Sequence, residues 1–470
     1  MTLTDSQTVW QFFHEICQIP RPSKQEERMI EYLTRFAAAH NLPVRVDASG
    51  NVLITKPGNA PAIALQAHMD MVCEKTAESR HDFSKDPIET YIEDGWMRAR
   101  GTTLGADDGV GVALALAALL SDTARAVEAL FTVDEETGLT GAEAVEPGWL
   151  QASELINLDS EEDDELIIGC AGGCETSARY TLETSVPDAG SFAVRLEIKG
   201  LRGGHSGSDI HEHRANALQL LGRFIAGCRS QYPLRIAGFE GGRMHNAIPR
   251  EANAVVVVPL GKKEQIRIDW NIYLAELEEA WQQDEPGLQA QLDSCPLPET
   301  VWSDALTAGV LEAVTTCPHG VQAWSRKLEG IVETSCNLAS LKREDDLLLL
   351  VSSQRSCVEE SLDALAFEVY EKWAATGATP AITGRYTPWP PRFDSPLIRR
   401  TCDTYRRLFG TDVSVKVIHA GLECGLLQQK YPRMEMLSMG PTLRDVHSPS
   451  ERLKVDSVDK VWRLLQELIQ

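Results

Sequence analysis

The chain has 470 residues, more than one hydrophobic core usually organises, so we expect two domains. Its 43% hydrophobic and 24% charged residues are typical of a globular enzyme. The 69 acidic residues outnumber the 45 basic ones, and the formal charge of −24 repels phosphate backbones and anionic membrane surfaces. We therefore expect neither nucleic-acid nor membrane partners.

The N-terminal segment predicts a helix rather than a secretion signal. Val9, Phe12, Phe13 and Ile16 have amphipathic spacing, and no basic stretch precedes an unbroken apolar run. The longest apolar run, at 109–120, is too short to span a bilayer and predicts a buried helix. The eleven cysteines are scattered and lack paired C-x-x-C spacing, which favours reduced thiols in a cytoplasmic protein.

Residues 1–175 alternate between helix-like and strand-like segments. In chain order, the pattern predicts a helix at 24–39, strands near 43–46, 51–55 and 62–67, a helix from 109, and strands at 127–133 and 154–158. Such alternation is typical of an α/β fold, in which helices cover a mostly parallel sheet.

From residue 176 the pattern becomes that of an α+β unit. The predicted strands are FAVRLEIKG, LRIAGFEGG, EANAVVVVPL and DDLLLLVSSQRS, and the predicted helices are NALQLLGRFIAG, IRIDWNIYLAELEEAWQQ and SLDALAFEVYEKWAATG. The stretch at 284–330 has no clear periodicity, so we expect it to be less regular.

The proline-rich segment TPWPPRFDSP at 387–396 closes this unit, because proline does not fit inside a central strand. Beyond it the α/β pattern returns, with strands in VSVKVIHAG and MEMLSMG and a closing helix in VDSVDKVWRLLQELIQ. We therefore expect residues 1–175 and 387–470 to form one discontinuous domain, with 176–386 as an inserted domain.

Three apolar stretches end at side chains that can bind a metal ion. AIALQAHMD ends at His68 and Asp70, VEALFTVDEE at Glu135 and Glu136, and ELINLD at Asp159. Functional crevices of open α/β sheets lie at the carboxyl ends of the strands, so three such endings predict one shared site.

Two further residues extend this set. Asp107 lies in the glycine-rich turn GTTLGADDG before a helix, and His447 lies in VHSPSERL near the C-terminus. Imidazole and carboxylate ligands together suit zinc or a similar divalent ion. A carboxylate such as that of Asp107 or Asp108 can also bridge two metals about 3.5–4 Å apart.

Spacing within the motifs suggests a division of work. Side chains two apart in a strand share a face, so His68 and Asp70 project together, and one can bind a metal while the other orients it. Glu135 and Glu136 reach one site only if the backbone turns there, after which one can bind a metal and the other act as a general base. We expect Asp134 to be a solvated neighbour of this pair.

Nine motifs, in this order and spacing, resemble the aminoacyl-histidine dipeptidases. The motifs are LQAHMDMV, RGTTLGADDGVGVA, TVDEETGLTGA, INLDSEE, GCAGG, KGLRGGHSG, HNAIPRE, IHAGLECGLL and GPTLRDVHSPSERL. This group, also called peptidase D or Xaa-His dipeptidases, is a carnosinase-like branch of the co-catalytic zinc peptidases and aminoacylases. The resemblance covers essentially the whole chain.

The resemblance implies two divalent metal ions per subunit, with zinc expected and cobalt or manganese as alternatives. It makes Asp107 the bridging ligand. His68 and Asp159 would complete one metal site, and Glu136 and His447 the other.

The resemblance also implies how the substrate is attacked. Asp70 would orient His68, and Glu135 would act as general base on a water that bridges the metals. His205 in GGHSG resembles a lid histidine that stabilises the oxyanion, often from the partner subunit of a dimer.

Three more residues resemble positions that bind substrate. Asn246 in HNAIP and Arg355 in SSQRS would hold the C-terminal end of the peptide, and a guanidinium can grip a carboxylate through two hydrogen bonds. Gly421 in HAGLECG would line the substrate pocket. His211 and His213 fall outside these sets, and we expect them on a solvated face.

Together these implications predict a cytoplasmic metallopeptidase that is a homodimer through its lid domain. It would hydrolyse dipeptides, with Xaa-His dipeptides such as β-alanyl-histidine among them. The alternatives are a related amidohydrolase with the same two-metal centre, such as an aminoacylase or a tripeptidase, and a non-enzymatic metal-binding protein.

Overall fold

The computed structural model describes residues 6–326 and 330–470. It divides the chain into two compact units. The first unit contains Met1–Cys170, Trp389–Val417 and Leu422–Gln470, and the second contains Ala171–Pro388 and Ile418–Gly421. The proline-rich segment thus lies where the chain returns to the first unit.

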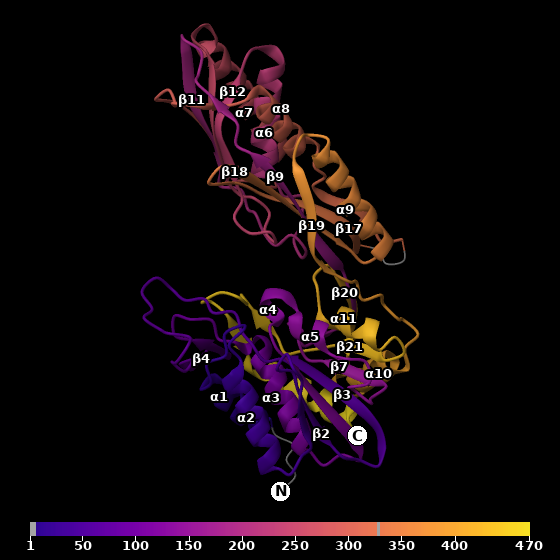
Figure 1. The fold of residues 1–470 in the computed structure, drawn as a ribbon. Helices are drawn as coiled ribbons and strands as arrows, with labels where there is room; N and C mark the ends of the chain where they lie inside the picture. Colours follow the sequence, from indigo (N-terminus) through magenta and orange to yellow (C-terminus); the bar gives the residue numbers. More distant parts are fainter. Residues whose placement is uncertain (1–5, 327–329) are drawn as a thin grey trace. The chain divides into compact units, whose positions relative to one another are not determined.

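A sheet with the strand order β1-β2-β6-β3-β7-β21-β8-β20 organises the first unit. Its strands are β1 (Val44–Val46), β2 (Val52–Lys56), β3 (Ala60–His68), β6 (Arg125–Thr132), β7 (Glu154–Asn157), β8 (Glu165–Cys170), β20 (Ser414–Ile418) and β21 (Glu435–Ser438). The central strands β6, β3, β7 and β21 run parallel, whereas β1, β2 and β8 pair antiparallel. In Figure 1 the yellow C-terminal segments accordingly lie among the purple N-terminal ones.

Helices of the first unit bury their apolar faces, as the sequence predicts. The helices are α1 (Gln7–Cys17), α2 (Glu27–Ala39), α3 (Ala106–Leu120), α4 (Glu135–Gly138), α5 (Thr140–Ala144), α10 (Pro396–Phe409), α11 (Glu423–Lys430) and α12 (Val455–Leu468). The predicted apolar face of α1 is buried, and α3 is buried along nearly its whole length. Residues 1–5 of the N-terminal segment lie outside the described residues.

A smaller antiparallel sheet in the first unit joins segments near the two ends of the chain. Its order is β22-β23-β5-β4, with β4 (Thr90–Glu93), β5 (Trp96–Ala99), β22 (Leu443–Arg444) and β23 (Arg452–Lys454). The loop between β22 and β23 carries His447, so this sheet positions the C-terminal candidate ligand.

The second unit has an antiparallel sheet with the order β14-β11-β13-β12-β17-β18-β9-β19, to which β16 adds beside β17. Its strands are β9 (Gly172–Thr181), β11 (Ser191–Lys199), β12 (Arg235–Gly241), β13 (Ala252–Pro259), β14 (Gln289–Cys295), β16 (Gly320–Trp324), β17 (Val332–Glu344), β18 (Leu347–Ser356) and β19 (Thr379–Tyr386). β10 (Thr184–Ser185) and β15 (Val301–Trp302) form a separate pair.

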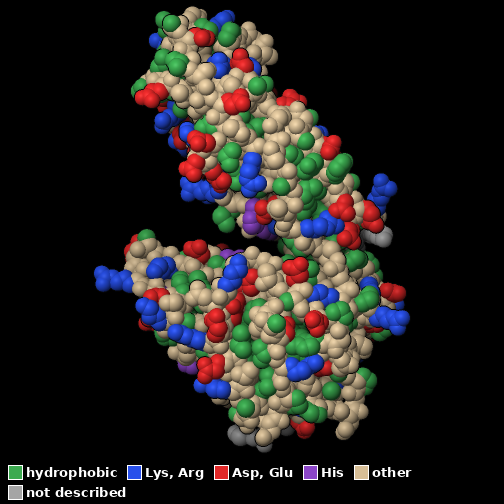
Figure 2. Space-filling view, viewed as in Figure 1, with side chains coloured by type: hydrophobic (Ala, Val, Ile, Leu, Met, Phe, Trp, Pro, Cys, Tyr) green, Lys and Arg blue, Asp and Glu red, His purple; other side chains and the backbone are tan. Residues whose placement is uncertain are grey.

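Helices α6 (Ala217–Gln231), α7 (Lys263–Trp281), α8 (Asp304–Thr316) and α9 (Glu359–Ala374) complete the second unit, together with the short turn η1 (Leu260–Lys262). Their buried side chains, including Phe224, Trp270 and Trp373, join those of the sheet in one core. The predicted fold class, an α/β domain with an inserted α+β domain, is confirmed. Figure 2 shows acidic and basic side chains interspersed on the visible face of each unit.

The prediction of a less regular stretch at 284–330 is wrong, because it contains β14, β15, α8 and β16. The signal for α8 was present: the Ser303 hydroxyl accepts a hydrogen bond from the Leu306 N–H, a typical helix N-cap. β14 is an edge strand with mostly exposed polar residues, so it lacks a strong apolar alternation. The sequence reasoning also missed β17, β19 and α10.

Two other expectations concern the whole described chain. No disulfide joins any of the eleven cysteines, all of which lie in the described part. Among residues 6–326 and 330–470, no helix has both the length and the apolar character needed to cross a bilayer.

Candidate metal centre

Three parallel strands of the first unit end at the same edge of its sheet. In the sheet register, His68 at the end of β3 lies opposite Thr132 at the end of β6. Gln66 of β3 lies opposite Asn157 at the end of β7. Because neighbouring parallel strands point the same way, the side chains that follow these ends gather at one edge.

A sharp turn after β6 brings both glutamates to this edge. Asp134 has a left-handed backbone (φ 51°), and α4 begins at the next residue. Asp134 is only 4% exposed, and its carboxylate accepts hydrogen bonds from the hydroxyls of Thr137 and Thr140. The expectation that Asp134 is solvated is therefore wrong, because its carboxylate holds the turn together.

The Asp107 carboxylate lies between two imidazoles. Its Oδ1 is 3.0 Å from Nε2 of His68, and its Oδ2 is 3.0 Å from Nε2 of His447. Asp159 Oδ1 lies 3.8 Å from the same His68 nitrogen, and Glu136 Oε2 lies 3.0 Å from the His447 nitrogen. The two oxygens of one carboxylate thus face two separate sets of ligand atoms.

Within the described residues, three groups of side chains have ligand atoms close enough to hold a metal ion. They are His68 with Asp107 and Asp159, Asp107 with Glu136 and His447, and His68 with Glu135 and Glu136. The first two groups share Asp107 and match the two ligand sets that the resemblance implies. The third shows that Glu135 also lies within reach of a metal.

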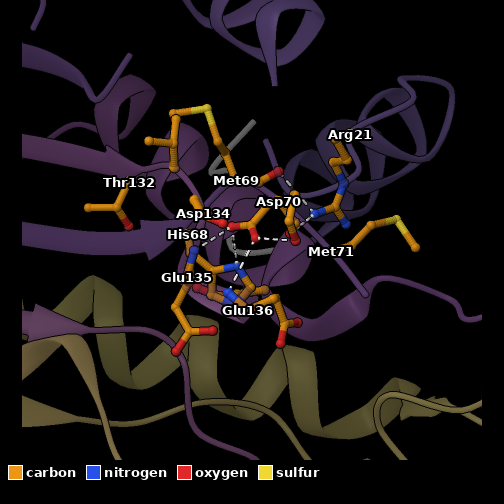
Figure 3. A network of polar contacts seen from close by, with 12 residues as sticks. Arg21, His68, Met69, Asp70, Met71, Thr132, Asp134, Glu135 and Glu136 are labelled. Atoms are coloured by element: carbon orange, nitrogen blue, oxygen red, sulfur yellow. Dashed lines mark hydrogen bonds and ion pairs between the residues drawn. The ribbon is translucent and has the colours of Figure 1, made fainter. Parts of the chain in front are cut away.

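Asp70 contacts His68 and supports the centre without belonging to a candidate ligand group (Figure 3). It is fully buried, and its Oδ1 lies 3.3 Å from Nδ1 of His68. It also accepts hydrogen bonds from the backbone N–H groups of Glu135 and Glu136 and from the Ser23 hydroxyl. One carboxylate therefore orients the imidazole and fixes the start of α4.

The carboxylates around the two imidazoles favour the charged form of each ring. Burial alone would favour neutral rings, but hydrogen bonds to Asp107 and Asp70 raise the pKa of His68 well above its usual range. In the same way, Asp107 and Glu136 outweigh burial and raise the pKa of His447 to about 11. The site thus favours positive charge at these two rings, which bound metal ions would supply.

Positive charge at the site would stabilise the ionised forms of its buried carboxylates. Burial raises the pKa of Asp159 well above its usual range, and the nearby Asp107 adds to this rise. Burial raises the pKa of Glu135 likewise, with Glu136 and Glu423 contributing against the effect of His68. Glu136 Oε1 is buried without a hydrogen-bond partner among the described residues. Such a donor set fits divalent cations.

Glycines make room for polar side chains next to the Asp107 turn. A Cβ at Gly105 or Gly109 would lie 2.6 Å from Nη2 of Arg21, and a Cβ at Gly111 would lie 2.1 Å from Oδ1 of Asp108. Gly105 also has a left-handed backbone (φ 67°). The glycine-rich turn thus allows the close approach of Arg21 and Asp108.

Sequence reasoning missed two buried groups that support the site. Glu451 accepts hydrogen bonds from backbone N–H groups of the Asp107 turn, and Arg21 donates to backbone carbonyls beside it. Position 451 lies in the recognised motif VHSPSERL, so the motif pointed to the loop without indicating this role.

Glu423 is fully buried and accepts hydrogen bonds from Gln66 and Thr132 near the ends of β3 and β6. Burial raises the pKa of Glu423 to about 7. These contacts favour a packed, supporting role for Glu423.

The second unit carries the other candidate residues. His205 forms an isolated bridge with Ala247, and the N–H of Ser206 donates to the carbonyl of Asn246 at 2.7 Å. The His205 ring is held by Ser208 Oγ at 2.9 Å from Nδ1. His205 and Asn246 therefore lie on adjoining loops, while His211 and His213 are exposed as expected.

Arg355 and Gly421 meet at one tyrosine of the second unit. Arg355 Nη1 donates to the Tyr386 hydroxyl at 2.7 Å, and a Cβ at Gly421 would lie 2.8 Å from the Tyr386 ring. Arg355 is 8% exposed, and its Nε has no hydrogen-bond partner among the described residues. This guanidinium retains donor capacity for an anionic group.

A buried histidine lies near this cluster. His419 Nε2 is 2.7 Å from the Ser335 hydroxyl, and burial together with Arg355 lowers the pKa of His419 to about 3. The folded protein therefore keeps this ring neutral at pH values where an unfolded chain, with a pKa of about 6.5, becomes protonated.

We expect His419 to destabilise the fold in acid. Stability is complete above pH 6.5 and falls as the pH drops toward 3, by roughly 1.4 kcal/mol per pH unit. Between pH 6.5 and 5, the free energy of unfolding of wild type should fall by roughly 2 kcal/mol more than that of His419→Gln. Urea unfolding at stepped pH tests this, with exposed His14→Gln as control. Parallel curves for wild type and His419→Gln would contradict the assignment.

Comparison with known proteins agrees with this architecture. A sequence model of Peptidase family M20/M25/M40 matches residues 64–470. The cytosol non-specific dipeptidase of Escherichia coli is 39% identical over 99% of this chain and 97% of its own length. An aminoacylhistidine dipeptidase from Vibrio alginolyticus is 38% identical in sequence. Its crystal structure matches with a TM-score of 0.86 over 98% of this chain and 96% of the Vibrio chain.

More distant structures share the fold. An aminopeptidase from Bacillus cereus is 15% identical with a TM-score of 0.56, over 99% of this chain and 98% of its own. The expected resemblance to the aminoacyl-histidine dipeptidases is confirmed by the two more similar proteins. The chain therefore belongs to Peptidase family M20/M25/M40 and is a metallopeptidase.

Proposed function

We propose that this protein is a cytoplasmic dipeptidase that uses two divalent metal ions, with Xaa-His dipeptides among its substrates. One observation carries the proposal: the Asp107 carboxylate belongs to two candidate ligand groups at once. His68 and Asp159 complete one group, and Glu136 and His447 the other. Zinc is the metal we propose, with cobalt or manganese as alternatives, because imidazole and carboxylate ligands suit all three.

Metal ions bound here would polarise the scissile carbonyl and acidify water. Glu135 is our candidate for the general base, because its carboxylate lies within reach of the centre yet belongs to neither of the two ligand groups that share Asp107. It would take the proton from the attacking water and return it to the leaving amine. Asp70 would keep the His68 ring in orientation throughout.

The second unit would recognise the substrate. Arg355 would bind the C-terminal carboxylate through its guanidinium, and Asn246 would hydrogen-bond the same end of the peptide. Gly421 would line the pocket, because a Cβ at this position would lie 2.8 Å from the Tyr386 ring. His205 would donate to the oxyanion. We propose that the second unit acts as a lid and as the surface of a homodimer.

Substrate choice needs direct measurement, because the names of the two similar proteins differ. One is called non-specific and the other an aminoacylhistidine dipeptidase. We expect hydrolysis of free dipeptides after reconstitution with zinc, cobalt or manganese, with a preference for C-terminal histidine. The measurement is kcat/KM over a panel that varies one position at a time.

Matched substrates distinguish the alternatives. N-acetylated dipeptides test the aminoacylase reading, and tripeptides test the tripeptidase reading. Faster cleavage of either class would favour that activity. No hydrolysis of any substrate by metal-loaded protein would overturn the proposed function. A monomer with full activity would contradict a His205 that acts from the partner subunit.

A further inference from the structure

A buried carboxylate holds the turn that carries Asp107. Glu451 is 2% exposed. Its Oε2 accepts hydrogen bonds from the N–H groups of Leu104 at 2.7 Å and Gly105 at 2.9 Å. Its Oε1 accepts from Ala106 at 2.8 Å and Asp107 at 3.3 Å. Four consecutive backbone N–H groups thus converge on one side chain.

A buried guanidinium holds the same turn from its other side. Arg21 is 2% exposed and donates through Nη2 to the Gly105 carbonyl. Its Nη1 donates to the carbonyl of Asp70 at 2.6 Å and to that of Met69 at 3.2 Å. Gly105 therefore donates its N–H to a negative side chain and accepts a hydrogen bond at its C=O from a positive one.

These contacts connect segments that bear the candidate ligands. Glu451 follows His447 by four residues in the same loop, so it ties that loop to the turn of Asp107. Arg21 ties the turn to the end of β3, which carries His68. Neither side chain belongs to a candidate ligand group. Both therefore act on the centre through the backbone.

We propose that Glu451, with Arg21, is a positioning residue that sets the direction of the Asp107 carboxylate toward both His68 and His447. This inference rests on the proposed two-metal function. Burying a carboxylate is unfavourable unless hydrogen bonds compensate it, and here four backbone N–H groups supply them. A bridging carboxylate must meet two ions at once, so a small rotation of its backbone would weaken both sites.

A second buried carboxylate provides a matched control. Glu128 is 5% exposed and accepts hydrogen bonds from the backbone N–H groups of Gln151 and Ala152. It belongs to no candidate ligand group. Glu128→Gln and Glu451→Gln both replace a buried acceptor of backbone N–H groups by an amide whose own NH2 faces those donors. Only the second change affects the Asp107 turn.

The test measures metal affinity rather than activity alone. Wild type, Glu451→Gln and Glu128→Gln are freed of metal and titrated with zinc against a chromophoric chelator. The cobalt forms are compared by visible absorption, and the urea midpoints of the metal-free proteins are measured. We expect Glu451→Gln to bind zinc about 10- to 100-fold more weakly, with an altered cobalt spectrum. Glu128→Gln should lower the urea midpoint while keeping wild-type affinity and spectrum.

Each outcome decides a separate point. Zinc affinity of Glu451→Gln within twofold of wild type would overturn the positioning role. Equal losses of affinity in both variants would also overturn it, because a general loss of stability would then explain them. Absence of zinc binding by wild type would instead overturn the proposed function. If Glu451→Gln does not fold, Arg21→Lys replaces it, since lysine keeps the charge but cannot span the three carbonyls; unchanged affinity in that variant would overturn the proposal.

Discussion

Glu135→Gln should lose activity while it keeps its metal. The change preserves side-chain size but removes the group that would accept and return the proton, so kcat should fall by about 10²- to 10⁴-fold. KM should change little, because the substrate contacts proposed for the second unit are untouched. Metal analysis after dialysis and steady-state kinetics on a dipeptide check both parts.

The neighbouring glutamate is the matched control. Glu136 lies 3.0 Å from the His447 ring, and Glu136→Gln should reduce the metal content as well as the rate. If Glu135→Gln loses as much metal as Glu136→Gln, then Glu135 is a ligand, as the group of His68, Glu135 and Glu136 would allow. A fully active Glu135→Gln would overturn its role as base.

Asp107→Asn should impair both metal positions at once. Asp107 contributes one oxygen toward His68 and the other toward His447, and an amide has only one oxygen to offer. We expect the dialysed variant to lose most of its metal at both positions, and activity to fall below about 1% of wild type. His447→Asn should lose about one ion of two and keep the other.

The adjacent aspartate provides the control for this change. Asp108 is buried and accepts a hydrogen bond from the Gly111 N–H, and burial raises the pKa of Asp108 well above its usual range. Asparagine keeps an oxygen that can accept from the Gly111 N–H, so Asp108→Asn should retain its metal. Retention of two ions by Asp107→Asn would refute its bridging position.

Local pattern predicted most of the elements that carry the centre. β3, β6 and β7 are apolar runs of strand length, and α3 is a continuous apolar helix, so their burial follows from composition alone. Elements with mixed or polar patterns were missed. α10 had a readable start, since Ser395 caps it and Pro396 opens it, but arginines and other polar residues separate its apolar positions.

The candidate ligands were predictable for a different reason. His68, Asp159 and Glu136 follow strand ends, and parallel strands must present those ends at one edge. Asp134 shows the limit of this reasoning. An aspartate before two glutamates resembles a solvated acid. The Asp134 carboxylate is nevertheless buried and accepts hydrogen bonds from the hydroxyls of Thr137 and Thr140.

The amino-acid sequence by itself determined the fold class, the strands that end at the metal centre and the candidate ligands, because each depends on periodicity or on motifs contained in short segments. Only the tertiary structure decided how distant segments combine. It placed Glu451 on the N–H groups of residues 104–107 and Arg21 on the carbonyl of Gly105. Hydrogen bonds between a side chain and a remote stretch of backbone have no periodic pattern in the sequence, because any buried turn with suitable geometry can form them.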